Sequence, residues 1–356
     1  MVSGLWPWIA GSGTPMIGVP LGRHLASGAT VCCDPISWYQ RGGIIPQPSG
    51  FILGLPGIGK TSLVMRIALG LEGYGVIPLV LGDTRPDYTE MVRQLGGQVI
   101  GQAMVAASRT VEDRRPHSLH AYFLLPGDMD APIVYEVDRL RDGSSFSARR
   151  VQAIQHGRPI LSMMASFQID EGGLEHHLPM PEVPPPESLT PIDELRETWF
   201  AAVPELPQAV RDVLTQPLAI EFRPVSSANP LIPQQQAAPY NQIWFRAVAP
   251  LPDAPWLHRC LLAYASDFNL IATALKPHGR SWYSPDMMVA SLDHALWFHR
   301  DARIDDWLLY DMDSPSAQGA RGMTRGLIYS RDGALVASVA QEGLMRHRPD
   351  ATAVRA

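Results

Sequence analysis

The stretch 98-QVIGQAMVAASRTV-111 is rich in small residues and has helical spacing, and a series of strand-like runs follows it. Turn signals at 141-RDG-143 and 156-HG-157 separate these runs, as in β-hairpins. A longer helical stretch, 254-APWLHRCLLAYASDFNLIATAL-275, is also followed by strand-like runs, and 331-RDG-333 repeats the earlier turn. The second half of the chain therefore looks like a degenerate copy of the first. The repeat predicts an α+β fold in which a helix followed by an antiparallel sheet occurs twice.

The composition is that of a globular protein with 356 residues, 46% of them hydrophobic, and a net charge of -6. Without a basic excess, we do not expect the chain to bind nucleic acid by neutralising phosphates. No apolar run reaches the roughly 18 residues of a membrane span, and no secretory signal is visible. The three cysteines include the adjacent pair Cys32 and Cys33, which is poorly placed for a mutual disulfide. This usage is typical of a reducing compartment, so we expect a cytoplasmic protein.

Changes of composition and hydrophobic pattern along the chain predict five segments. The first carries a glycine-rich loop, the second and fourth are the two helix-plus-sheet repeats, and the third is proline-rich with the composition of a linker. The predicted boundaries are 1–96, 97–177, 178–216, 217–349 and a tail at 350–356.

The glycine-rich loop 54-GLPGIGKT-61 fits the phosphate-binding pattern G-x-x-x-x-G-K-[ST]. An apolar run precedes it and the helical pattern 61-TSLVMRIALGL-71 follows it, as the pattern requires. Asp83 is the only candidate for a second magnesium ligand, and we favour the interpretation that it simply caps the next turn. We therefore expect at most weak binding of ATP and magnesium, and negligible ATP hydrolysis. The residues that would hold the nucleotide are Gly54, Gly57, Gly59, Lys60 and Thr61.

The first 96 residues resemble the ATPases of conjugative type IV secretion systems. The resemblance rests on 6-WPW-8, on residues 51–88 and on 94-QLGGQVI-100, and it covers only the start of that family's nucleotide-binding core. It implies a partial P-loop α/β fragment. In this fragment 76-VIPLVLGD-83 would pair in parallel with 51-FIL-53, because helix 61–71 offers a right-handed crossover. The alternative is that 76–83 pairs with the sheet of the first repeat.

From residue 96 to about residue 348 the chain resembles acyl-CoA thioesterase II, a family with a double hotdog fold. The family fold implies two long helices, each wrapped by an antiparallel sheet, and the hydrolysis of fatty acyl-CoA to fatty acid and CoA without a cofactor. We also expect a homo-oligomer. The matching stretches include 96-GGQVIGQA-103, 117-HSLHAYFLLPGD-128, 263-AYASDFNL-270, 291-SLDHALWFHR-300 and 334-ALVASVAQEGLMR-346.

The resemblance implies an active site in which a carboxylate, a hydroxyl and an amide jointly hold a water. These groups fall on Asp267, Ser291 and Gln341; threonine is common in the family at position 291, and serine keeps the hydroxyl. A thioester carbonyl is a good electrophile, so a water activated by one carboxylate can attack it without a covalent intermediate. Asp267 would be the general base, while Ser291 and Gln341 would orient the water.

The histidines could line the pocket, and His117 and His294 are the candidates, with His117 expected to touch the site. No histidine spacing indicates a metal site, because 117-HSLH-120 and 294-HALWFH-299 fall in predicted strands. The first repeat is expected to lack a site of its own. Its helix has no acid to match Asp267, and aligning 160–166 with 335–341 places Ser166 where Gln341 stands.

The two resemblances meet at 96-GGQVI-100, so the chain looks like a fusion of two unrelated genes at a shared string. The thioesterase family has a strand before its first helix, and here that strand is missing. Two alternatives to a hydrolase stay open at this point. One is a nucleotide-binding or secretion-related module with a non-catalytic hotdog scaffold, and the other is a non-catalytic acyl-CoA-binding protein.

Overall fold

The computed structural model describes residues 20–23, 30–32, 95–128, 131–206, 211, 214–215 and 218–348. The chain divides into two compact units, Met1–Val80 and Leu81–Ala356. In the first unit the described residues form one antiparallel pair, β1 (Pro20–Arg23) with β2 (Thr30–Cys32). The phosphate-loop motif 54–61 and the pairing predicted for 76–83 lie outside the described residues.

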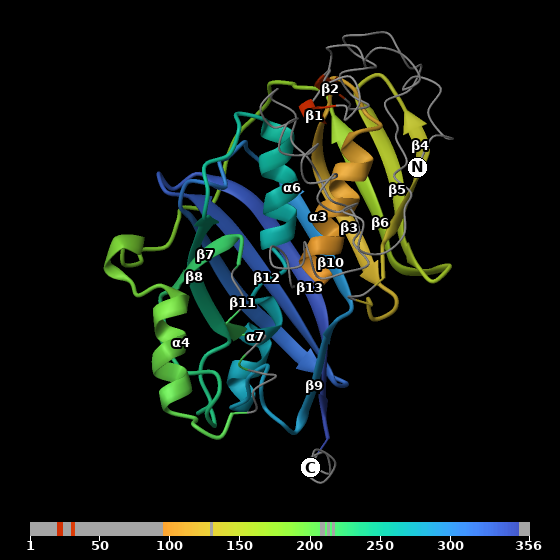
Figure 1. The fold of residues 1–356 in the computed structure, drawn as a ribbon. Coiled ribbons are helices and arrows are strands. Elements are labelled where there is room, and N and C mark those ends of the chain that lie inside the picture. Colours follow the sequence, from red (N-terminus) through yellow and green to blue (C-terminus); the bar gives the residue numbers. More distant parts are fainter. Residues whose placement is uncertain are drawn as a thin grey trace, which may run out of the picture. The chain divides into compact units, whose positions relative to one another are not determined.

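The second unit contains an 11-stranded sheet whose two ends are built by the two repeats. In the first half of this unit, α3 (Leu95–Ser108) is followed by four strands, as predicted (Figure 1). Alternating residues of the last two of these strands are buried, which is the pattern of a sheet with one covered face. The strands are β3 (Arg115–Phe123), β4 (Val134–Asp142), β5 (Phe146–Gln155) and β6 (Arg158–Gln168).

The second half repeats this arrangement with additional strands in front of its helix. Where one helix was predicted over 254–275, the structure has α6 (Pro255–Ala265) and α7 (Leu270–Leu275). The break lies at Asn269, whose φ of 67° is in the left-handed region. Asparagine tolerates this conformation better than most residues. The strands are β7 (Ile220–Pro224), β8 (Tyr240–Ala247), β9 (Met287–Ser291), β10 (Asp293–Phe298), β11 (Leu308–Gln318), β12 (Arg321–Ser330) and β13 (Leu335–His347).

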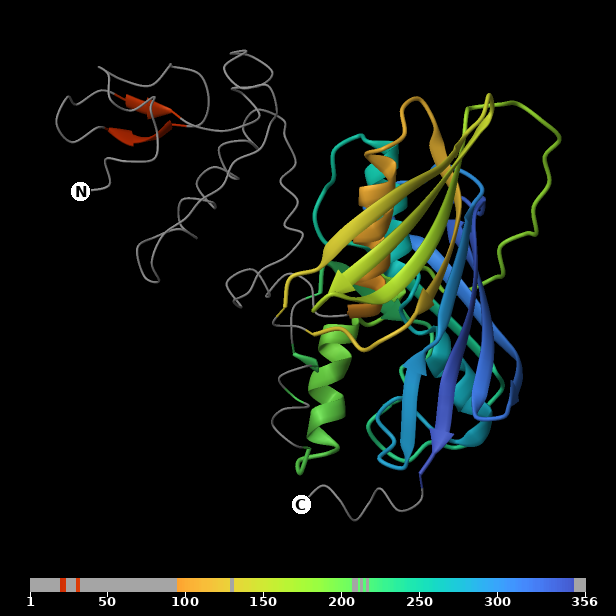
Figure 2. The same cartoon turned by 90° about the vertical axis from the view of Figure 1, so that its right-hand side faces the viewer.

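The two halves join edge to edge and helix to helix. Strands β3 and β10 pair antiparallel, with His120 opposite Ala295, so one continuous sheet runs through both halves. Helices α3 and α6 lie side by side against it, and the strands of the first half curve past α3 (Figures 1 and 2). A Cβ atom at Gly97 would lie 2.4 Å from the carbonyl oxygen of Tyr264, so the helices pack closely because this position is glycine. These features confirm the predicted tandem hotdog architecture.

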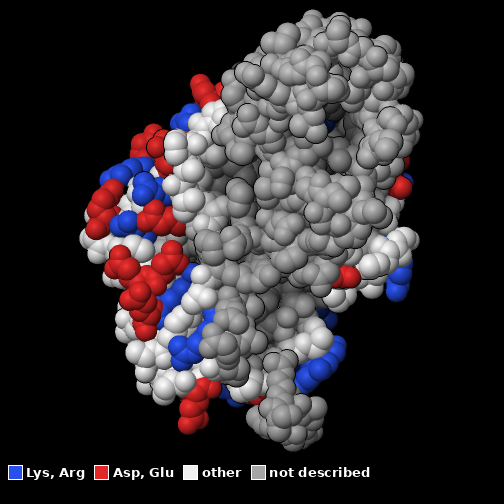
Figure 3. Space-filling model, in the orientation of Figure 1, with Lys and Arg blue, Asp and Glu red and all other residues white. Residues whose placement is uncertain are grey.

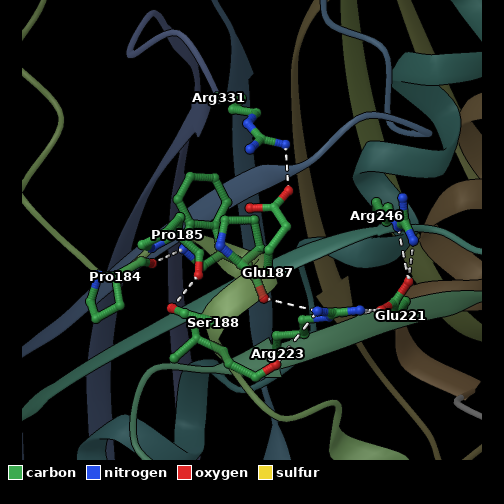
Figure 4. Close-up of polar contacts among 11 residues, drawn as sticks. Pro184, Pro185, Glu187, Ser188, Glu221, Arg223, Arg246 and Arg331 are labelled. Carbon is green, nitrogen blue, oxygen red and sulfur yellow. Dashed lines mark hydrogen bonds and ion pairs between the residues drawn. The ribbon is translucent and has the colours of Figure 1, made fainter.

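The described first part of the segment predicted as a linker packs as a strap over the outer face of the sheet in the second half. It contains the 3₁₀ turn η1 (Pro186–Ser188) and the helix α4 (Ile192–Ala201). The indole of Trp244 donates to the carbonyl oxygen of Pro184 at 3.0 Å. Arg223 donates to the carbonyl oxygen of Pro186 at 2.9 Å, and Arg331 pairs with Glu187 at 2.7 Å (Figure 4). The proline content predicted a connection between the repeats. It did not predict that this connection packs against the sheet.

Strand β4 is the end of the sheet in the first half. Its counterpart β11 lies between β12 and β8, whereas the described strands offer β4 only β5 as a partner. Strand β8 precedes α6 in the chain, and the first half has no described strand before α3. Large apolar side chains on β4 are correspondingly exposed, Val134 at 57% and Leu140 at 50%. The residues before α3 in this half lie outside the described part of the chain, so the predicted loss of the first strand stays a prediction.

Charged side chains are mixed in sign over the described surface seen in Figure 3. Many of them form pairs across neighbouring strands, such as Arg150 with Asp138 and Arg325 with Asp313. No helix within the described residues has the length and apolar character needed to cross a membrane.

Candidate active site

The structure brings together the three residues that the sequence singled out. The side-chain amide of Gln341 donates from Nε2 to Asp267 Oδ1 at 3.2 Å and to Ser291 Oγ at 2.7 Å. A carboxylate and a hydroxyl are thereby held on the same amide nitrogen. The three residues come from three separate elements of the second half.

Local structure accounts for each position. Asp267 lies in the turn where α6 ends, and the left-handed Asn269 turns the chain there before α7 begins. Ser291 is the last residue of β9 and pairs with Gly343 of β13. Gln341 belongs to the inward-facing residues of β13 and is 1% exposed. Strand alternation thus places the amide beneath the helix end.

The first half completes the site through the start of α3. The backbone N–H of Gly97 donates to the carboxylate of Asp267. A Cβ atom at Gly96 would lie 2.5 Å from Asp267 Oδ2, so the carboxylate approaches the helix where a side chain is absent. The first N–H groups of a helix lack intrahelical partners and carry partial positive charge, which favours an anion there. Sequence reasoning missed this role of the glycine pair, although glycines at a helix start were the available signal.

His294 lies behind the amide of Gln341 and is fully buried. Its Nδ1 is 3.0 Å from Gln341 Oε1, its Nε2 is 2.8 Å from Ser266 Oγ, and its ring lies 4.0 Å from the carboxylate of Asp267. The sequence predicted His294 to line the pocket. The structure instead places it in the hydrogen-bond network that supports Gln341, with no exposed surface for a substrate.

His117 does not lie with these residues. Its Nε2 is 2.8 Å from Ser166 Oγ, and its ring packs edge-on against Phe146. Both neighbours belong to the first half of the unit. The expectation that His117 touches the site is therefore not met.

The predicted alignment of 160–166 with 335–341 is wrong, because it equates residues that lie on opposite faces of the sheet. Gln341 is on the inward face of β13, whereas Ser166 alternates with the buried Ala165 and Phe167 and lies on the opposite face of β6. Met163, Ala165 and Phe167 form the inward face at this depth, and none of them carries an amide. The first half thus lacks a group equivalent to Gln341 for a reason that differs from the predicted one.

Burial dominates the electrostatics of the site. It raises the pKa of Asp267, while His294, Gln341, Gly97 and Ser291 oppose that rise. Burial also lowers the pKa of His294, with the charge of Asp267 acting in the other direction. A poorly solvated carboxylate is a stronger base than one in water, which suits proton abstraction.

Other catalytic chemistries find little support in the described part of the chain. Within it, no group of three or more His, Cys, Asp and Glu residues could hold a metal ion. The thiol of Cys260 is buried, and burial raises its pKa to about 12, so it is not a ready nucleophile.

Comparison with known proteins agrees with the fold. Family models described as acyl-CoA thioesterase N-terminal domain and acyl-CoA thioesterase match residues 84–168 and 216–344. The first match begins before the junction predicted at residue 96.

The matches extend over most of the length of the relatives and of the solved structures. Acyl-coenzyme A thioesterase 8 of Homo sapiens is 41% identical over 264 residues, which is 72% of this chain and 82% of that protein. Acyl-CoA thioesterase 2 of Haemophilus influenzae is 41% identical over 256 residues, 70% of this chain and 87% of that protein. The crystal structure of the acyl-CoA thioesterase II TesB2 from Mycobacterium marinum matches with a TM-score of 0.58 and 42% identity, covering 72% of this chain and 90% of that one. The chain belongs to the acyl-CoA thioesterase family.

Proposed function

We propose that the chain, an acyl-CoA hydrolase by its family, cleaves the thioester by direct attack of a water that Asp267 activates. The observation that carries the proposal is the shared hydrogen bonding of Gln341 Nε2 to Asp267 and Ser291. It sets a buried base beside a hydroxyl that can orient a water. The assembled trio favours hydrolysis over the non-catalytic alternatives.

In the proposed reaction, Asp267 takes a proton from the water while the water oxygen bonds to the thioester carbonyl carbon. Collapse of the tetrahedral intermediate breaks the C–S bond and releases the CoA thiolate. Asp267 then returns its proton to the thiolate sulfur, so the products are fatty acid and CoA. The first turn of α3, next to the carboxylate, is the proposed source of N–H donors for the developing oxyanion. These steps need neither metal nor cofactor.

The test is Asp267→Asn, which keeps the size of the side chain but cannot accept the proton. We expect acyl-CoA hydrolysis to fall by roughly 10²- to 10⁴-fold, the usual contribution of a general base. Ser291→Thr is the matched control, because it keeps the hydroxyl and should stay within a few-fold of the parent. Near-normal turnover by the asparagine variant would remove Asp267 from the role of base.

We also propose that the chain acts in the cytoplasm as a homo-oligomer. Apolar side chains of three neighbouring strands are exposed on the outer face of the sheet: Tyr122 at 62%, Met164 at 50% and Trp297 at 36%. Exposed apolar clusters of this kind often mark interfaces. Light scattering at micromolar concentration should give more than one chain per particle, and Trp297→Asp should lower that number. A monomeric parent protein would contradict the proposal.

A further inference from the structure

We infer that His294 is a positioning residue that keeps the amide of Gln341 in one orientation through the reaction, with Ser266 supporting it. The inference rests on the proposed function. It concerns residues behind the trio, which the sequence did not place there.

The orientation of the amide decides whether the site works. With Nε2 toward Asp267 and Ser291, the amide donates to both, and Oε1 faces His294. A flip by 180° would turn Oε1 toward Asp267. While Asp267 is ionised, its charge repels Oε1 and prevents the flip. Once Asp267 has taken the water proton, it becomes a donor, and a flipped amide could hold the proton that the thiolate needs.

His294 removes this alternative because of its tautomer. An amide oxygen can only accept, so the 3.0 Å contact requires a hydrogen on Nδ1. That N–H holds Oε1 whether Asp267 is ionised or protonated. Two further bonds fix the backbone around it: Thr324 donates to the carbonyl oxygen of Gln341 at 3.0 Å, and Tyr310 donates to that of Ser266 at 2.8 Å.

Ser266 lets His294 hold this tautomer while neutral. With the hydrogen on Nδ1, Nε2 is an acceptor, and the Ser266 hydroxyl donates to it at 2.8 Å. The same hydroxyl also donates to the carbonyl oxygen of Ala263 at 3.0 Å, so two acceptors share its hydrogen. The acids near the ring are Asp267 and Asp293, which both favour the charged form, and burial opposes them.

Packing alone does not call for these polar groups. His294 and Ser266 are fully buried and Gln341 is 1% exposed, and burying polar groups is costly unless each finds a partner. The neighbouring strand β3 carries the apolar Leu119 and Ala121 on its inward face. The fold therefore accepts hydrocarbon at this layer, and a polar network here points to a task in the reaction.

The experiment compares His294→Asn with His294→Leu. The asparagine amide offers an N–H close to the position of Nδ1, so we expect its kcat within a few-fold of the parent. The leucine variant should lose roughly 10- to 100-fold in kcat, the common cost of removing a group that orients a catalytic residue, with KM little changed. Equal activity of the two variants, at any level, would overturn the inference.

Two further measurements separate this inference from the proposed function and from misfolding. Nitrogen NMR of the unmodified protein should show the hydrogen of His294 on Nδ1, and a hydrogen on Nε2 alone would overturn the inference whatever the variants do. His294→Leu added to Asp267→Asn should cost nothing more, because no proton reaches residue 267. An active Asp267→Asn variant sinks the proposed function, whereas an inactive one beside a fully active His294→Leu sinks only the positioning role.

Discussion

Gly96 and Gly97 are adjacent, but an added methyl group would meet different atoms at the two positions. At Gly96 the nearest atom is the carboxylate oxygen Oδ2 of Asp267, at 2.5 Å. At Gly97 it is the backbone carbonyl oxygen of Tyr264, at 2.4 Å. A side chain can turn away at little cost, whereas a helix backbone cannot.

This difference predicts opposite effects for the two alanine variants. Gly96→Ala should displace the carboxylate and lower kcat at least tenfold, with stability near that of the parent because alanine favours the helix. Gly97→Ala should force α3 and α6 apart and cost about 1–3 kcal/mol of unfolding free energy. Hydrolysis assays beside urea denaturation measure both effects. Normal turnover by Gly96→Ala would mean that Asp267 does not need this close approach.

The raised pKa of Asp267 predicts a pH dependence of both activity and stability. Activity requires the carboxylate, so kcat should fall on acidification at a pH above the ordinary value of 3.8. For stability the sign is reversed. The folded state holds its proton more tightly than the unfolded chain, so this group's contribution is present below pH 3.8 and is lost as pH rises through the folded pKa. Asp267→Asn should abolish that loss of stability. If the prediction is wrong, the slope of unfolding free energy against pH over the acidic range will be the same in the variant and the parent.

At the scale of single elements, one buried cation holds the turn that follows α3. Arg149 of β5 is 2% exposed, and its guanidinium donates to the hydroxyl and to the carbonyl oxygen of Thr110, just past the helix end. It also pairs with Asp142 at 2.6 Å. Its guanidinium also donates to the carbonyl oxygens of Arg141 and Ala148 on β4 and β5, and a cation near a helix C-terminus is favoured by the helix dipole.

Replacing Arg149 by methionine should therefore destabilise the protein by about 2–3 kcal/mol, because the carbonyl oxygens are left unpaired. The neighbouring Arg150 is the matched control. Its pair with Asp138 is half exposed on both sides, so Arg150→Met should cost less than about 1 kcal/mol. Denaturant midpoints at constant slope measure the difference. Equal losses would show that burial of the guanidinium does not matter here.

At the scale of the whole unit, the described sheet ends at β4 in the first half and at β7 in the second. Strand β11 has partners on both edges, while β4 has only β5 among the described strands. An edge of unpaired N–H and C=O groups invites pairing with another chain. The charges Glu136, Asp138, Arg139 and Arg141 on β4 discourage such contacts.

Hydrogen exchange resolved by residue tests the state of this edge. The amides of β4 that point away from β5 should exchange far faster than those of β11, whose amides are bonded on both sides. The amides of β4 that point toward β5 are the internal control and should be protected. Slow exchange on both edges of β4 would show that another segment or a second copy covers it.

The sequence alone determined the repeat and the elements of each half. Helical spacing, strand alternation and the Arg-Asp-Gly turns are local signals, readable because each depends on a few neighbouring residues. The resemblance to the thioesterase family pointed to Asp267, Ser291 and Gln341, and the structure brings their side chains together. Their catalytic roles stay predictions until the variants are measured.

Only the tertiary structure decided what surrounds these three residues. The helix break at Asn269 aims Asp267 at β13, and the glycine pair that receives its carboxylate comes from the other half of the unit. His294 and Ser166 show why sequence reasoning stopped short. In a strand a shift of one residue exchanges the buried face for the outer one, so the neighbours of a side chain depend on register. Register is set by pairing between segments far apart in the chain, which no local pattern encodes.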